Sequence, residues 1–256
     1  MTMVPVLMYH GLHDSPRSAW RFDPVYSVTP AAFARQLDWL DANGYTAVRL
    51  EQAFDDAGPG SPGRRVVISF DDGDVSNIEV ALPMLRERGM HAEFFITTGF
   101  IDQPGMLSAA DVRALAEAGM GIGSHGTTHA FLEDLDEPRL LAELQDSRQR
   151  LESITARPVS ALALPGGRGG DRERRLALAL GYRHLLGSVP GINRKREGGW
   201  LERIAVTRDL DLTGFSRRVA WRGMRPRLLQ VRHQALGVTK RVLGNAGYER
   251  LRERLL

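Results

Sequence analysis

The sequence predicts an α/β fold in which a parallel sheet closes, or nearly closes, into a (β/α) barrel. Short apolar segments rich in branched side chains alternate along the chain with longer segments of helical period, and glycine follows most of the helical segments. The 256 residues suffice for one such barrel. Neither an internal repeat nor a clean linker interrupts the chain before about residue 190.

Five segments are expected to form buried strands, because apolar and β-branched residues run together in them. The sequence RVVISF at residues 65–70 is the clearest of these. In chain order the expected strands are residues 4–9, 65–70, 91–97, 120–124 and 160–164.

Five helices are expected between and after these strands. Thr29-Pro30 supplies a capping hydroxyl and a proline at the first helical position, and Ser108 with Asp111 forms a capping box. Pro83 disturbs the first half of the second helix. In chain order the helices run from residue 30 to Gly44, from 77 to Gly89, from 108 to Gly119, from 136 to 155 and from 171 to Gly181.

Composition excludes several kinds of site. The chain has no cysteine, which excludes disulfides, thiolate nucleophiles, zinc fingers and iron–sulfur clusters, so that any metal must be held by His, Asp or Glu. The first ten residues contain no basic segment and no signal-cleavage pattern, and no segment is apolar for long enough to cross a bilayer. We therefore expect a cytoplasmic protein without a signal peptide.

Chemically active residues follow four of the expected strands. His10 follows the first, Asp71-Asp72-Gly73 the second, His125-Gly-Thr-Thr-His129 the fourth and Pro165-Gly-Gly-Arg168 the fifth. Barrel enzymes carry their chemistry at the carboxyl ends of the strands, so these residues are expected to meet there.

His125 and His129 have the spacing of a metal-binding pair. On a helical turn, residues four apart share a face, and Asp71 or Asp72 would complete a set of two histidines and one carboxylate. Such a set leaves coordination positions open, as catalytic metals require, and the other aspartate could act as a base. Either motif alone would be weak evidence, because H-x-x-x-H is common and Asp-Asp-Gly is usually a turn.

We interpret His13, His91, His184 and His233 as structural or surface histidines.

Together, Ser69-Phe-Asp-Asp-Gly73 and Ser124-His-Gly-Thr-Thr-His129 resemble the first two motifs of the NodB-homology, or family 4 carbohydrate esterase, polysaccharide deacetylases. Val6-Leu-Met-Tyr-His10 and Ala163-Leu-Pro-Gly-Gly167 resemble the poly-N-acetylglucosamine N-deacetylase subgroup. The resemblance covers about residues 3–185 and implies a distorted (β/α) barrel.

The resemblance also implies a role for each site residue. Asp71 would be the general base and His10 the general acid. Asp72, His125 and His129 would hold one divalent metal, zinc by preference, with cobalt or nickel also compatible with this ligand set. The backbone N–H of Gly166 would help to hold the oxyanion.

The sequence departs from the family pattern at two positions. The hydroxyl residue that usually follows the first metal histidine is Gly126 here. The third motif usually carries an arginine that orients the base, and the matching residue here is Ala163, so Arg168 is the candidate for its substitute.

The activity implied is metal-dependent hydrolysis of an N-acetyl group on an amino sugar, in a polysaccharide or a glycan precursor, as in exopolysaccharide biosynthesis. The alternatives are a deformylase or amidase, or an O-acetyl esterase, acting on a lipid-linked sugar. A catalytically dead carbohydrate-binding relative is the alternative from another class, and the missing arginine slightly favours it.

The charge is unevenly distributed. Residues 217–256 hold eleven Lys or Arg and two acids, a net of +9, so residues 1–216 carry −6 of the total of +3. We expect a catalytic domain at 1–216 and a basic helical extension at 217–256. Leu228, Val231, Ala235, Val238 and Val242 form its apolar stripe. The extension either packs on the barrel or rests on anionic lipid at the inner membrane face. Nucleic acid is not expected as a partner, because no recognition motif accompanies the charge.

Overall fold

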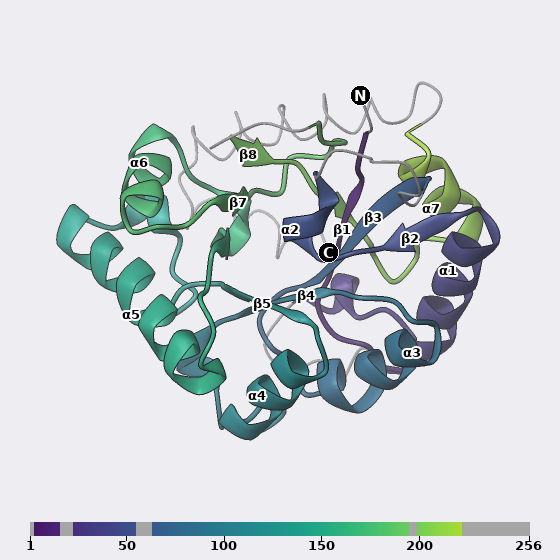
Figure 1. Ribbon diagram of the computed structural model, residues 1–256, viewed down its shortest axis with the longest axis horizontal. Coiled ribbons are helices and arrows are strands. Elements are labelled where there is room, and N and C mark those ends of the chain that lie inside the picture. Colours follow the sequence, from purple (N-terminus) through teal and green to yellow (C-terminus); the bar gives the residue numbers. More distant parts are fainter. Residues whose placement is uncertain (1–2, 16–22, 55–62, 195–198, 222–256) are drawn as a thin grey trace, which may run out of the picture.

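The computed structural model describes residues 3–15, 23–54, 63–194 and 199–221 (Figure 1). Within these residues nine strands form one sheet in the order β8-β7-β6-β5-β4-β3-β1-β9, with β2 paired to β3. Every neighbouring pair is parallel. The strands are β1 (Val6–Tyr9), β2 (Tyr45–Ala47), β3 (Arg64–Phe70), β4 (Glu93–Ile96), β5 (Gly121–Ser124), β6 (Ala161–Ala163), β7 (His184–Leu186), β8 (Trp200–Leu201) and β9 (Ile204–Ala205).

The two outermost strands of this order are neighbours in the sequence. Strand β8 pairs with β7 at one end of the sheet, and β9 pairs with β1 at the other end. Glu202 and Arg203 connect them, so this short segment joins the two ends of the curled sheet. Apart from the single helical turn Leu50–Ala53, the helices lie in an arc outside the strands (Figure 1). The predicted distorted (β/α) barrel is therefore confirmed.

The helices begin where the sequence supplies caps. Thr29 Oγ1 accepts a hydrogen bond from the Ala32 amide, and Ser108 and Asp111 form the expected capping box. The helix containing Pro83 is preceded by a π-helical segment, Asn77–Ala81, because proline cannot donate to the carbonyl four residues before it. The α-helices are α1 (Pro30–Ala42), α2 (Leu50–Ala53), α3 (Leu82–Glu87), α4 (Ala109–Glu117), α5 (Glu137–Thr155), α6 (Asp171–Ala179) and α7 (Leu212–Val219).

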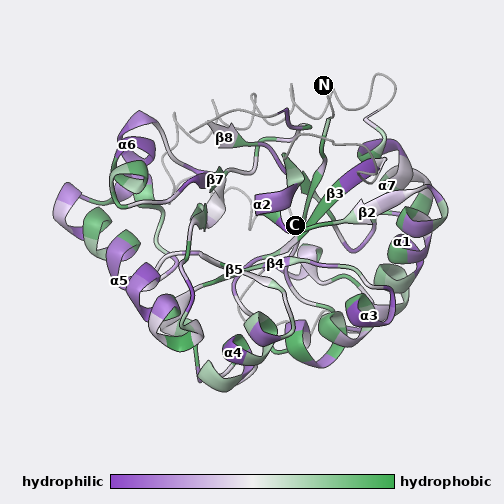
Figure 2. Cartoon of the chain, viewed as in Figure 1, coloured by the Kyte–Doolittle hydropathy of each residue, from purple (hydrophilic) through white to green (hydrophobic). Residues whose placement is uncertain are grey.

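The strands separate two apolar clusters. Val66, Ile68 and Phe70 of β3 belong to the larger cluster, which includes the buried faces of the outer helices, whereas Val67 belongs to a smaller one with Phe95. This alternation follows from the pleat of a strand. The outer helices carry both hydrophilic and hydrophobic residues along their length, as helices with one buried face do (Figure 2).

Several elements were not predicted. Strands β2, β7, β8 and β9 have only two or three residues each, too few to show a period, and α2 is a single turn. Helix α7 crosses the expected domain boundary between residues 216 and 217, and its Phe215 and Val219 are buried. The apolar stripe expected in the basic extension lies outside the described residues. No helix among the described residues is long and apolar enough to cross a membrane.

Candidate active site

Three of the predicted metal ligands meet at the carboxyl ends of β3 and β5. One ligand atom each from Asp72, His125 and His129 lies within 4.8 Å of the others. Asp72 Oδ1 is 3.4 Å from His125 Nε2 and 3.2 Å from His129 Nε2. Two imidazole nitrogens and one carboxylate oxygen are a donor set that suits zinc and leaves room for water or substrate. The residues present therefore fit a catalytic divalent metal.

The two histidines do not reach this arrangement on a helical turn. Residues 125–129 form an irregular loop, and both His129 and Gly126 adopt left-handed backbone conformations, with φ of 64° and 78°. Asp72 is also left-handed, with φ of 75°. Non-glycine residues rarely adopt this conformation, and strain of this kind concentrates at functional sites. The helical interpretation of the H-x-x-x-H spacing is wrong, although the two side chains do meet.

A backbone carbonyl orients His125. Its Nδ1 lies 2.8 Å from the carbonyl oxygen of Ala163, which can only accept, so Nδ1 carries the proton and Nε2 presents its lone pair to the centre. Burial lowers the pKa of His125 to about 4, although Asp71 and Asp72 oppose the shift. The ring is thus neutral near pH 7, as a metal ligand must be.

Asp72 is ionised in this setting. Burial alone would raise its pKa, but the hydrogen bond with His129 and the electrostatic interaction with the neighbouring imidazoles outweigh burial and hold the pKa well below the ordinary value. An anionic oxygen facing two imidazole nitrogens adds electrostatic attraction for a cation.

The neighbouring Asp71 points to a different partner. Its Oδ1 lies 2.7 Å from Nη1 of Arg203, and both side chains are at most 3% exposed. The Arg203 Nε also donates to the carbonyl of Gly187 at 2.7 Å, which fixes the guanidinium. Burial raises the pKa of Asp71, but Arg203, His125 and His10 together lower it below the ordinary value. A buried carboxylate that stays ionised can accept a proton from a nearby water.

Arg203 is the functional residue that the sequence reasoning missed. Its guanidinium makes the contact with Asp71 that was expected of an arginine in the third motif, whereas Arg168 contacts Phe131 and Glu133. It lies between two strands of two residues each, and its local sequence, WLERIAV, shows only a Glu-Arg pair flanked by apolar residues.

His10 directly follows β1, and its imidazole is among the groups that lower the pKa of Asp71 and Asp72. Its ring stacks on Tyr26 with the centroids 4.6 Å apart, and its carbonyl accepts a hydrogen bond from Asn77 Nδ2 at 2.9 Å. These contacts fix the His10 backbone and imidazole at the carboxyl end of β1, the end of the sheet that also carries Asp72 and His125.

Gly166 and Arg168 lie around one aromatic ring. Gly166 has a φ of 63°, and a Cβ there would come within 2.5 Å of Phe131 Cε1. The Arg168 guanidinium lies over the same ring, 4.3 Å from its centroid, and Nη1 lies 3.4 Å from Glu133 Oε1. Arg168 therefore contacts Phe131, the residue that also lies against Gly166.

The histidines interpreted as structural have other surroundings. His13 Nε2 lies 3.1 Å from Asp74 Oδ1. His91 and His184 lie at the amino ends of the strands, away from the metal ligands, and His233 is outside the described residues.

Comparison with known proteins finds similarity to polysaccharide deacetylases. Residues 59–185 match the family model of the polysaccharide deacetylases. The Bacillus subtilis (strain 168) protein "Putative polysaccharide deacetylase YxkH" is 26% identical over 217 residues, which are 83% of this chain and 74% of that protein.

Two solved structures share the fold. The Streptococcus pyogenes deacetylase PplD, in complex with acetate, has a TM-score of 0.75 and 24% identity, over 85% of this chain and 98% of that one. IcaB from Ammonifex degensii has a TM-score of 0.74 and 23% identity, over 86% of this chain and 97% of that one.

Proposed function

Because the chain belongs to the polysaccharide deacetylase family, we propose that it is a metal-dependent hydrolase that removes an N-acetyl group from an amino sugar of a glycan. One observation carries the proposal: a donor set for a catalytic metal, Asp72, His125 and His129, lies beside a second buried carboxylate, Asp71, that has its own arginine.

The residues divide the reaction between them. A divalent ion held by Asp72, His125 and His129 would polarise the acyl carbonyl and lower the pKa of water at the site. Asp71 accepts the proton of the attacking water, and Arg203 keeps Asp71 ionised and oriented.

The remaining two residues act on the substrate side. The backbone N–H of Gly166 donates to the developing oxyanion, an interaction typically worth about 3 kcal/mol. Protonated His10 donates to the leaving nitrogen, and the products are acetate and a free amine.

Arg203 also bears on the alternative of a catalytically dead relative. That alternative drew support from the missing motif-three arginine, and the contact between Arg203 and Asp71 removes this support. The deformylase, amidase and O-acetyl esterase alternatives would use the same centre and differ in the acyl group removed or in whether that group is bound to nitrogen or to oxygen.

The test is mass spectrometry of N-acetylated amino-sugar oligomers after incubation with the zinc-loaded protein. Loss of acetyl groups from the nitrogen supports the proposal. Turnover of N-formyl or O-acetyl sugars alone would replace it with an alternative, and no turnover of any would contradict it.

Variants assign the roles. Asp71→Asn should abolish turnover but keep zinc, His125→Ala should lose both, and His91→Gln is the remote histidine control. Full deacetylase activity of Asp71→Asn would refute the mechanism.

The basic extension could bring the enzyme to a lipid-linked or membrane-proximal glycan. Since Phe215 and Val219 are buried in α7, a truncation should end at Trp221 rather than at residue 216. Co-sedimentation with anionic vesicles then compares the full chain with residues 1–221. Binding by the full chain alone supports lipid contact, and equal, negligible binding removes that interpretation.

A further inference from the structure

Glu143 of α5 faces the loop that carries both histidine ligands. Its side chain is buried, and its carboxylate accepts three hydrogen bonds from the residues between the histidines. Oε2 accepts from the Thr127 amide at 2.6 Å and from the Thr128 amide at 3.0 Å, and Oε1 accepts from the Thr128 hydroxyl at 2.5 Å. Hydrogen bonds to a carboxylate are roughly twice as strong as neutral ones.

The loop depends on this carboxylate because its backbone is unfavourable by itself. Gly126 and His129, on either side of the two threonines, are both left-handed. A Cβ at Gly126 would lie 3.0 Å from Glu143 Oε2, so glycine at this position leaves room for the carboxylate. The departure from the family pattern at Gly126 thus goes together with the approach of Glu143.

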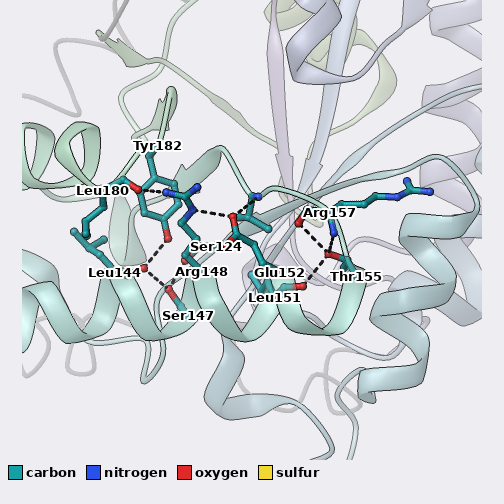
Figure 3. A network of polar contacts seen from close by, with 11 residues as sticks. Ser124, Leu144, Ser147, Arg148, Leu151, Glu152, Thr155, Arg157, Leu180 and Tyr182 are labelled. Carbon is teal, nitrogen blue, oxygen red and sulfur yellow. Dashed lines mark hydrogen bonds and ion pairs between the residues drawn. The ribbon is translucent and has the colours of Figure 1, made fainter.

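A second chain of hydrogen bonds fixes α5 to the strand before the loop. The Gly126 amide donates to Ser124 Oγ at 3.1 Å, Ser124 and Ser147 hydroxyls are 2.7 Å apart, and Ser147 donates to the Glu143 carbonyl at 2.7 Å. Figure 3 shows Ser124 and Ser147 beside Tyr182, whose hydroxyl donates to the Leu144 carbonyl at 2.8 Å. The backbone of Glu143 is therefore fixed by Ser147, while its carboxylate binds the loop at Thr127 and Thr128.

We propose that Glu143 is a positioning residue for the metal centre, whose carboxylate fixes the backbone of residues 127–128 so that His125 and His129 face Asp72. The inference rests on the proposed metal-dependent function and adds to it a residue that touches neither metal nor substrate. Glu143 also brings a negative charge near His129, which favours a cation at the centre.

The experiment measures zinc affinity by competition with a metallochromic chelator, together with the melting temperature of the metal-free protein. Glu143→Leu removes every acceptor, and we expect zinc binding to weaken by about 10–100-fold. Glu143→Gln keeps one oxygen for the two amides, so its affinity should lie between those of Glu143→Leu and the unmodified protein.

Glu152, on the same helix, provides the matched control. Its Oε1 accepts from the Val159 amide at 3.0 Å and from Arg148 Nε at 2.9 Å, and neither residue belongs to the loop that carries the histidines (Figure 3). Glu152→Leu should lower the melting temperature and leave zinc affinity unchanged.

The outcomes separate the two proposals. If the unmodified protein does not bind zinc, the proposed function fails and this inference fails with it. If it binds zinc, unchanged affinity in Glu143→Leu overturns the inference alone, as does an equal loss in Glu152→Leu. If Glu143→Leu does not fold, the comparison of Glu143→Gln with Glu152→Gln decides, and equal affinities overturn the inference.

Discussion

The buried pair of Asp71 and Arg203 should show a large coupling energy. Neither side chain can be rehydrated in place when its partner is removed, because they are 3% and 1% exposed. Breaking a buried pair typically costs about 3–5 kcal/mol, and Arg203→Met also loses the hydrogen bond to Gly187, worth about 1 kcal/mol. We therefore expect Arg203→Met to lower the free energy of unfolding by about 4–6 kcal/mol.

A double-mutant cycle measures the coupling. Asp71→Asn leaves the guanidinium buried without a counterion, whereas Asp71→Asn with Arg203→Met removes both charges. The loss in the double variant should be smaller than the sum of the single losses by about 2–3 kcal/mol. Urea unfolding in the presence of a chelator gives the three values without any contribution from metal.

An exposed pair with similar geometry serves as the control. Arg88 Nε lies 2.9 Å from Asp38 Oδ1, with the aspartate 61% exposed, and such pairs are worth about 0.2–1 kcal/mol. Additive losses at Asp71 and Arg203, within about 0.5 kcal/mol, would refute the reasoning.

Three further predictions concern pH, the oxyanion position and the metal. Burial raises the pKa of Glu93 from 4.5 to about 7, so the folded state binds more protons between these values and its stability should fall as pH rises through this range, by about 3 kcal/mol. Glu93→Gln should flatten this dependence in urea unfolding at pH 4.5 to 8, and an unchanged slope would exclude Glu93 as the cause. Gly166→Ala places a Cβ against Phe131, so it should lower kcat while zinc affinity stays the same; unchanged kcat would contradict the oxyanion role. Removing metal should lower the melting temperature reversibly, because zinc at ~100 times its Kd adds about 2.7 kcal/mol, and identical melting curves with and without zinc would contradict a bound metal.

The sequence predicted the position of a site residue where that residue directly follows a recognisable strand. Asp72 and His125 follow strands that were evident from their apolar residues, so their meeting at one end of a barrel could be anticipated. The backbone of the His125–His129 loop could not, because it has left-handed residues and contacts with α5 that a local pattern does not contain. The spacing of His125 and His129 therefore predicted correctly that their side chains meet, but the helical turn it suggested is not present.

Arg203 was beyond prediction for a different reason. It is 132 residues from Asp71 in the chain, and the strands on either side of it have two residues each. A local sequence pattern cannot predict a contact between residues so far apart in the chain. Even the matched region of the family model, residues 59–185, excludes both Arg203 and His10.

The position of Arg203 between β8 and β9 has a consequence for the order of synthesis. A nascent chain that has been made only to residue 199 contains β1 to β7, with β1 and β7 as unpaired sheet edges. Asp71 is already present in that intermediate, but its counterion is not. When residues 200–205 emerge, one segment covers both edges and delivers the guanidinium to the carboxylate. Pairing of β8 and β9 thus brings Arg203 to Asp71, and we expect a chain that stops before residue 200 to lack this contact even when Asp72, His125 and His129 are in place.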